Sequence, residues 1–173
     1  TKESLMIAKR QGMLDQNQKS EILLPLVLHR NTERIEELKP LQQAMKKYFL
    51  IPGSPDLAKL DIIEQAFLDS EFHPVFWGRR LDQKHSLNYT ALADLEFSGV
   101  EELAAQSLGV ILCLHDFDPA ELLRWKTISL RYRVPLWARP DQQDAVPGLC
   151  HEGRTGFIVE ANPLDLRRSV QAD

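Results

Sequence analysis

Side chains that could bind an anion follow several apolar runs in this sequence. Arg79 comes two residues after Trp77, Arg139 comes two residues after Trp137, and His115 and Asp116 directly follow Val110–Leu114. A guanidinium group binds phosphate or carboxylate through two parallel hydrogen bonds, so these residue types suit an anion site. We therefore take Arg79, His115, Asp116 and Arg139 as a candidate anion-binding rim. The alternative is that they are solvated strand ends whose arginines pair with nearby acids.

No group of residues meets the requirements of a catalytic site. His115 and Asp116 are neighbours, and neighbours on a strand point to opposite faces, so adjacency does not make them an acid–base dyad. Cys113 could share a face with His115, but it lies in an apolar run where a thiol is expected to be inert. Cys150 and His151 lie in a glycine-containing loop, and no third catalytic residue can be placed beside them. We assign no catalytic residue.

The sequence also lacks the familiar motifs of cofactor and metal sites. Neither GxGxxG nor GxxxxGK[ST] occurs, and there is no GxSxG nucleophile turn. The histidines, at positions 29, 73, 85, 115 and 151, show no spacing typical of zinc ligands. We expect no cofactor and no metal.

Composition indicates an ordinary globular domain. The 173 residues are 43% hydrophobic and 27% charged, and the formal net charge of −4 comes from interspersed acids and bases. No basic footprint points to nucleic acid, and no apolar run approaches the roughly 20 residues that span a bilayer. Two cysteines and no signal-peptide pattern favour a reducing compartment, so we expect a cytoplasmic location.

Short apolar runs alternate with helical patterns from residue 21 onward. Strands are predicted at 22–28, 74–77, 110–114, 134–138 and 156–159, and residues 80–90 are predicted to form a loop. Helical spacing predicts a helix from about residue 32 to Tyr48, which Pro40 kinks. Four further helices are predicted: one capped by Ser54 with Pro55 at its first position, one with a Ser98–Glu101 capping box, one with an Asp118–Glu121 capping box, and one capped by Asn162.

This alternation predicts an α/β fold. Parallel β-α-β units with right-handed crossovers give an open doubly wound sandwich, with a mostly parallel sheet of about four to five strands and helices on both faces. Residues 1–20 are predicted to form a peripheral N-terminal helix, and 21–173 a single α/β domain. The start at Thr1 and the stop at Asp173 suggest that this domain belongs to a larger protein.

The C-terminal segment resembles part of a known enzyme family. The stretch EGRTGFIV at 152–159, followed by NPLD at 162–165, is similar to the segment that closes the nucleotide-sugar domain of two-domain (GT-B) glycosyltransferases. The resemblance covers about the last forty residues. That family has paired glutamates eight residues apart in the preceding strand–helix unit, whereas this chain has Trp125-Lys126 where the second acid would lie. We interpret the resemblance as a shared turn–strand–cap pattern on an α/β sheet.

Two functions remain open. The first is a non-catalytic protein-interaction or regulatory domain that binds a protein partner or other domains of a parent chain. Trp77, Trp125 and Trp137 could anchor such an interface, or could simply fill the core. The alternative is an enzyme or sensor that binds a nucleotide or another anionic small molecule through the rim, including a degenerate glycosyltransferase-like domain.

Overall fold

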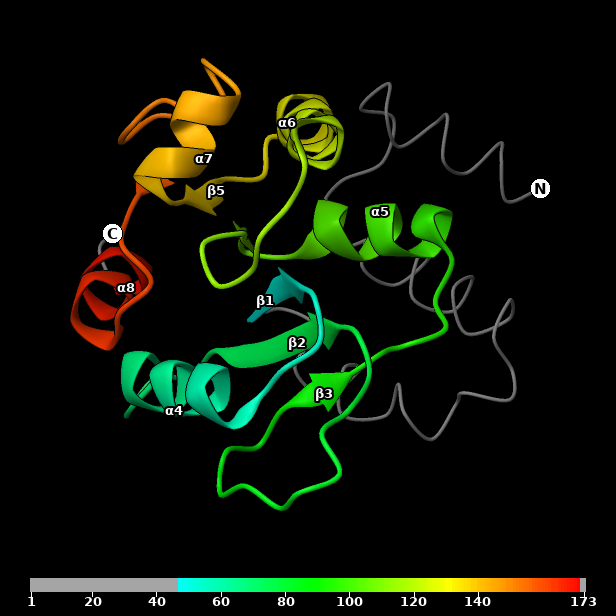
Figure 1. Cartoon of the computed structure of the whole chain (residues 1–173), viewed down its shortest axis with the longest axis vertical. Coiled ribbons are helices and arrows are strands. Elements are labelled where there is room, and N and C mark those ends of the chain that lie inside the picture. The colour runs from blue at the N-terminus through cyan, green and yellow to red at the C-terminus, as the bar shows by residue number, and fades with distance from the viewer. Residues whose placement is uncertain (1–46, 172–173) are drawn as a thin grey trace.

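The computed structural model describes residues 47–171 and contains a single sheet flanked by helices (Figure 1). In chain order the elements are β1 (Tyr48–Pro52), α4 (Leu57–Ala66), β2 (His73–Trp77), β3 (Thr90–Ala91), α5 (Phe97–Gln106), β4 (Val110–Ile111), α6 (Pro119–Tyr132), β5 (Leu136–Ala138), α7 (Pro140–Ala145), β6 (Gly156–Ile158) and α8 (Pro163–Val170). The predicted strand at 22–28, the N-terminal helix at 1–20 and most of the helix predicted from residue 32 lie outside the described residues.

The sheet has six parallel strands in the order β3-β2-β1-β4-β5-β6. Helices α4 and α8 pack on one face, and α5 and α6 pack on the other (Figure 1). The predicted open doubly wound α/β sandwich is therefore confirmed. The described part of the sheet has six strands, slightly more than the four to five predicted.

Strand β1 lies at the centre of the sheet and supplies both hydrophobic cores. Tyr48 and Leu50 belong to the core under α5 and α6, whereas Phe49 and Ile51 belong to the core under α4 and α8. All four side chains are at most 2% exposed. The Tyr48 hydroxyl donates to the Leu103 carbonyl at 2.6 Å, so β1 is also tied to α5 by a buried hydrogen bond.

Two predictions around β1 are wrong. Tyr48 begins this strand instead of ending a helix, and the N-cap of α4 is Asp56, which accepts a hydrogen bond from the Lys59 amide at 2.8 Å. A strand buried on both faces is a continuous apolar run, and hydrophobic periodicity alone does not distinguish it from a buried piece of helix. The two-residue strand β3, at the end of the predicted loop, was not predicted at all.

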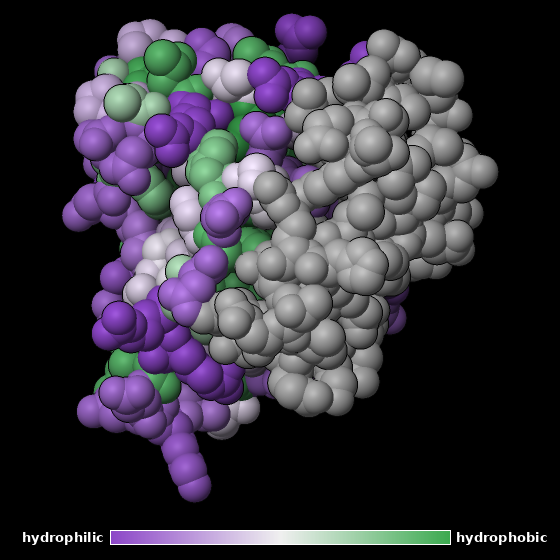
Figure 2. Space-filling view, turned by 90° about the vertical axis from the view of Figure 1, so that its right-hand side faces the viewer, coloured by the Kyte–Doolittle hydropathy of each residue, from purple (hydrophilic) through white to green (hydrophobic). Residues whose placement is uncertain are grey.

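The remaining elements follow the predicted pattern. Strands β2, β4, β5 and β6 overlap the runs predicted at 74–77, 110–114, 134–138 and 156–159. Helix α6 has the predicted capping box, in which Asp118 accepts from the Glu121 amide at 2.8 Å and Glu121 accepts from the Asp118 amide at 3.2 Å. The box predicted at Ser98 is wrong, because α5 begins at Phe97 after Glu96. On the face shown in Figure 2, the described surface is mainly hydrophilic, with small hydrophobic patches between.

Candidate functional site

The carboxyl ends of β1 and β4 mark the point where the strand order reverses. β1 leads to α4 on one face of the sheet, and its neighbour β4 leads to α6 on the other. In open parallel sheets, ligands bind in the crevice at such a switch point. Gly53 and Ser54 follow β1 here, and His115 follows the buried residues 112–114 after β4.

The imidazole of His115 fills the space above Gly53. Gly53 has a φ of 117°, and a Cβ atom at this position would lie 2.4 Å from the His115 ring. The His115 Nε2 lies 2.8 Å from the carbonyl oxygen of Ser54, so this nitrogen carries the hydrogen and donates it. The protein's own side chain therefore occupies the part of the switch point next to β1.

Burial favours the neutral form of this imidazole. Desolvation lowers the pKa of His115, and the hydrogen bond to Ser54 opposes this shift only in part. The other ring nitrogen, Nδ1, is buried and has no hydrogen-bond partner among the described residues. His115 thus holds an unused acceptor at the switch point.

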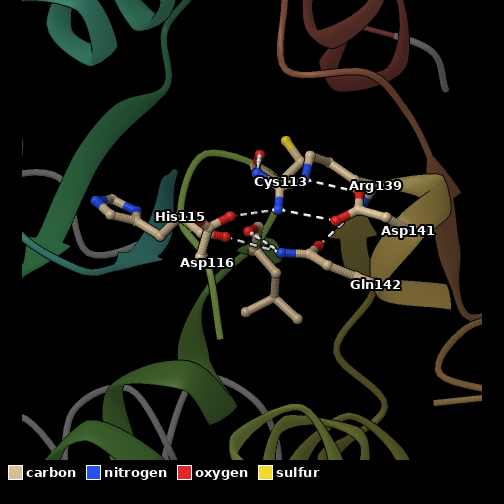
Figure 3. A network of polar contacts seen from close by, with 7 residues as sticks. Cys113, His115, Asp116, Arg139, Asp141 and Gln142 are labelled. Carbon is tan, nitrogen blue, oxygen red and sulfur yellow. Dashed lines mark hydrogen bonds and ion pairs between the residues drawn. The ribbon is translucent and has the colours of Figure 1, made fainter. Parts of the chain in front are cut away.

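Arg139, at the end of β5, is bound by two carboxylates (Figure 3). Its Nη2 lies 2.6 Å from Asp116 Oδ1, and its Nε lies 2.9 Å from Asp141 Oδ1. The same Nη2 donates to Asp141 Oδ2 at 3.1 Å, and Nη1 donates to the Cys113 carbonyl at 3.3 Å. The hydrogen bonds with Asp141 raise the pKa of Arg139 and lower the pKa of Asp141. The guanidinium therefore already makes, with carboxylates of the chain, the hydrogen bonds that it would make with a bound anion.

Gln142 of α7 connects the segment after β4 to the segment after β5, and it was not among the predicted site residues. Its Nε2 donates to the carbonyl oxygens of Leu112 and His115, both at 2.9 Å, and its Oε1 accepts from the Arg139 amide at 3.0 Å. The side chain is 3% exposed. One buried amide thus fixes the segment after β4 against the segment after β5. In the sequence, Gln142 is one polar residue in the first turn of the helix after β5, and no local pattern indicated this role.

The four predicted rim residues form two groups. Asp116 and Arg139 are paired, while the His115 ring points toward β1 and away from Arg139 (Figure 3). Arg79 belongs on the β1 side, where its backbone amide donates to Ser54 Oγ at 2.8 Å. Its side chain is exposed. Ser54 thus contacts both Arg79 and His115, whereas Arg139 is bound to Asp116 and Asp141.

The helix N-termini at this edge are also occupied by the protein's own carboxylates. Asp56 caps α4, and its hydrogen bonds with Lys59 lower the pKa of Asp56, so this acid stays ionised. Asp118 and Glu121 cap α6. Helix N-termini are common phosphate sites, and each of these two already holds a negative charge.

The cysteines and tryptophans pack in the interior. Burial raises the pKa of Cys113 to about 12 and that of Cys150 to about 11, so both are thiols at neutral pH. Trp125 and Trp137 are 2% and 3% exposed. Trp77 packs against the same core as Trp125 and donates to the Leu95 carbonyl at 3.1 Å. The tryptophans therefore fill the core, and an interface must be sought elsewhere.

The segment that resembles glycosyltransferases forms the β6 edge of the sheet within the described residues. Glu152 Oε2 accepts from the Ile158 amide at 2.5 Å, and the Gly153 amide donates to the Gly156 carbonyl at 2.9 Å. Gly153 has a φ of 74°, and a Cβ at Gly156 would lie 2.0 Å from the Leu136 carbonyl oxygen. The glutamate and both glycines of this stretch thus have structural roles here.

A cavity of about 480 Å³ lies beside this edge, and its lining includes Pro140, the residue after Arg139, but none of the four predicted residues. Its lining is mixed in charge and polarity and includes Glu152, Phe157, Glu160, Asp165 and Arg168. Within residues 47–171, no group of three or more His, Cys, Asp or Glu side chains is arranged to hold a metal ion. No helix in that range is long and apolar enough to cross a bilayer.

Comparison with known proteins does not place the chain in a family. No family model matches it, and no curated protein is significantly similar to it in sequence. Function must therefore be argued from the geometry of the carboxyl edge.

Proposed function

We propose that this chain is a non-catalytic protein-interaction or regulatory domain, built on a sheet of nucleotide-binding type. The observation that carries this proposal is the state of Arg139, whose guanidinium is bound by Asp116 and Asp141. A phosphate could reach this arginine only by displacing a carboxylate, and the remaining acid would repel it. The chain's own groups supply the negative charge that a ligand would otherwise bring.

Two further features support the proposal. The His115 ring occupies the switch point above Gly53, where a nucleotide would approach the backbone. The N-terminus of α4 is capped by the ionised Asp56. The partner we propose is a protein, or another domain of a parent chain. Both described cysteines are free and buried, which fits the cytoplasmic location that we propose.

The claim that Arg139 is not available to an anion is tested by neutralising its two acidic partners, Asp116 and Asp141. We expect millimolar phosphate, nucleotides and nucleotide sugars to leave the Tm of the wild-type chain unchanged. The D116N/D141N variant frees Arg139, and we expect phosphate to raise its Tm by a few degrees through binding linkage. Asp144→Asn is the matched control, because Asp144 is an exposed acid of the same helix α7. An equal response of all three proteins would contradict our account of Arg139.

The claim that the chain binds a protein partner is tested in cells. We expect chemical cross-linking of the tagged full chain in its native cells to yield one partner in near-stoichiometric amount. If no partner is enriched over a tag-only control, the interaction role is wrong.

The second candidate is a nucleotide- or anion-binding sensor or enzyme, including a degenerate glycosyltransferase-like domain. It is favoured by the strand order β3-β2-β1-β4-β5-β6, which dinucleotide-binding domains share, and by the unused Nδ1 of His115 at the switch point. Its test is a ligand that raises the wild-type Tm by several degrees. Loss of that shift in an Arg79→Ala/Arg139→Ala variant would favour this candidate over the first.

A further inference from the structure

Helix α6 presents an apolar ridge to solvent on the side opposite the core. Leu123 and Leu130 are 53% and 60% exposed, whereas Leu122, Trp125 and Ile128 of the same helix are at most 2% exposed. The two leucines are seven residues apart, so they lie on one face, about 10 Å apart along the helix axis. Thr127, also exposed, lies between them on the same face.

Basic side chains flank this ridge on both sides. Helical geometry places Arg124 and Arg131 along one side of the ridge and Lys126 along the other, and Arg133, the left-handed C-cap residue, follows the end of the helix. In heptad terms, the leucines take d positions, Thr127 takes the a position between them, and Arg124, Lys126 and Arg131 take e and g positions. Glu121 is the only acid from Pro119 to Arg133. The outer face of α6 therefore has the pattern of one strand of a coiled coil with basic edges.

Contacts with α5 hold one basic edge in place. The Arg124 guanidinium stacks over the Phe97 ring at 4.6 Å, and Arg131 Nη1 lies 3.5 Å from Glu101 Oε1. Side chains that are already ordered lose less entropy when they bind a partner. Arg124 is thus ordered beside the leucines with no acidic partner among the described residues, whereas Arg131 is paired with Glu101, and a partner's acid would have to share or replace that pair.

We propose that the outer face of α6 docks an acidic amphipathic helix of a partner protein, with leucine-like residues at its a and d positions and Asp or Glu at its e and g positions. The proposal rests on the interaction role proposed above and names its surface and the chemistry of its partner. Apolar residues fill the seam, and the e and g charges select the partner.

The same pattern disfavours two other occupants. A second copy docked through its own α6 would bring basic edges against basic edges. An anionic membrane offers little to a ridge of two leucines and one threonine, because binding in the membrane interface depends on a larger buried apolar area. An acidic helix satisfies both the leucines and the basic edges.

A synthetic peptide tests this surface directly. The probe has three heptads with Leu at a and d and Glu at e and g, and the control peptide has Lys at e and g. We expect the full chain to bind the Glu peptide about tenfold or more tightly than the Lys peptide in a fluorescence anisotropy titration, because the Glu peptide attracts the basic edges of α6 and the Lys peptide repels them. Raising NaCl from about 50 to about 500 mM should weaken binding several-fold, since these pairs are exposed. Equal binding of both peptides, or binding of neither, would overturn the proposal.

Substitutions distinguish binding of the peptide to the outer face of α6 from nonspecific binding elsewhere on the chain. The L123E/L130E variant should lose at least about tenfold in affinity for the Glu peptide. Leu164→Glu on α8 is the matched control, because Leu164 is 58% exposed and lies on another helix. The charge-swap variant R124E/K126E/R131E should reverse the preference and bind the Lys peptide. If the swap leaves the preference unchanged, or if vesicles of phosphatidylcholine and phosphatidylglycerol bind the wild type more tightly than the Glu peptide does, the assignment is wrong.

Cross-linking of these variants in native cells separates this proposal from the interaction role. Loss of the partner in L123E/L130E but not in L164E supports the α6 surface. Retention of the partner in both variants keeps the interaction role and overturns the α6 surface. If even the wild type captures no partner, the interaction role is wrong, and the peptide titration alone decides what α6 binds.

Discussion

His115 and Arg139 lie at the same edge of the sheet in opposite electrostatic surroundings. His115 is desolvated, and its neutral ring packs on Gly53 and donates to Ser54. Arg139 is paired with two carboxylates that are themselves largely exposed to solvent. The imidazole therefore contributes mainly packing, whereas the guanidinium contributes orientation of the segments that follow β4 and β5.

The contact between Gly53 and His115 predicts a coupled pair of substitutions. Gly53→Ala places a Cβ against the ring at a φ of 117°, and we expect it to lower the free energy of unfolding by about 1–3 kcal/mol. In a His115→Ala background the ring is gone and only the backbone strain remains, so the same substitution should cost less. A double-mutant cycle by urea denaturation measures the difference. Additive effects would show that the ring does not pack on Gly53 in solution.

Burial of two histidines predicts a pH dependence of stability. Desolvation lowers the pKa of both His73 and His115 in the folded chain. The unfolded chain then takes up protons first as the pH falls, so this contribution to stability is complete above about pH 6.5 and declines as the pH falls below that value. We expect the H73Q/H115Q variant to lose less stability than the wild type between pH 7.5 and 5, measured by urea denaturation. An identical decline in both proteins would exclude these histidines as its source.

Acids make a distinct contribution at lower pH. The hydrogen bond with Arg139 lowers the pKa of Asp141, so the stability from this pair is present above about pH 4 and is lost as the pH falls further. The two effects therefore occupy different pH windows. The histidine effect can be measured without interference from Asp141.

At the scale of elements, the outer side of β6, the last strand of the described sheet, is protected by its own loop. The Ile158 amide would be an open hydrogen-bond donor on an edge strand, and Glu152 accepts from it. The Gly156 carbonyl is likewise bound, by the Gly153 amide. Proteins commonly block edge strands in such ways, because open edges pair with other chains.

Removing this protection should destabilise the chain and promote association. We expect Glu152→Ala to lower the free energy of unfolding by about 1 kcal/mol and to increase light scattering on heating, because the Ile158 amide loses its acceptor. Glu152→Gln keeps an acceptor oxygen and serves as the matched control. If the alanine and glutamine variants behave alike, the acceptor oxygen of residue 152 is not what protects the edge.

At the scale of the whole molecule, β1 couples the two faces of the sheet. Leu50 points into the core under α5 and α6, and Ile51 points into the core under α4 and α8. Each core also contains its own tryptophan, Trp125 in the first and Trp137 in the second. Since one central strand serves both cores, neither core can form completely without it.

This coupling predicts a single unfolding transition. We expect Leu50→Ala and Ile51→Ala each to cost about 2–5 kcal/mol and to lower the Tm measured by circular dichroism and by tryptophan fluorescence to the same extent. Leu57→Ala at an exposed position of α4 should change the Tm little. Separate transitions for the two probes in either core variant would show that the faces unfold independently.

Local patterns in the sequence were enough to predict much of the fold. The runs at β2, β4, β5 and β6 and the capping box of α6 depend on residues close together in the chain, and they were predicted correctly. Strand β1 was missed because it is central and apolar on both faces, which removes the alternation that marks a strand. Strand β3 has two residues, too few to give any periodic signal.

The sequence by itself determined the fold class and the residue types at the carboxyl edge, because both depend on spacing along the chain. Only the tertiary structure decided what those edge residues contact. Arg139 meets Asp116 across 23 positions, and His115 meets Ser54 across 61. Such contacts depend on which strands are neighbours and in what order, and the strand order is set by packing the whole sheet between its helices. Whether an arginine at a strand end faces a ligand or a carboxylate is therefore a property of the folded chain.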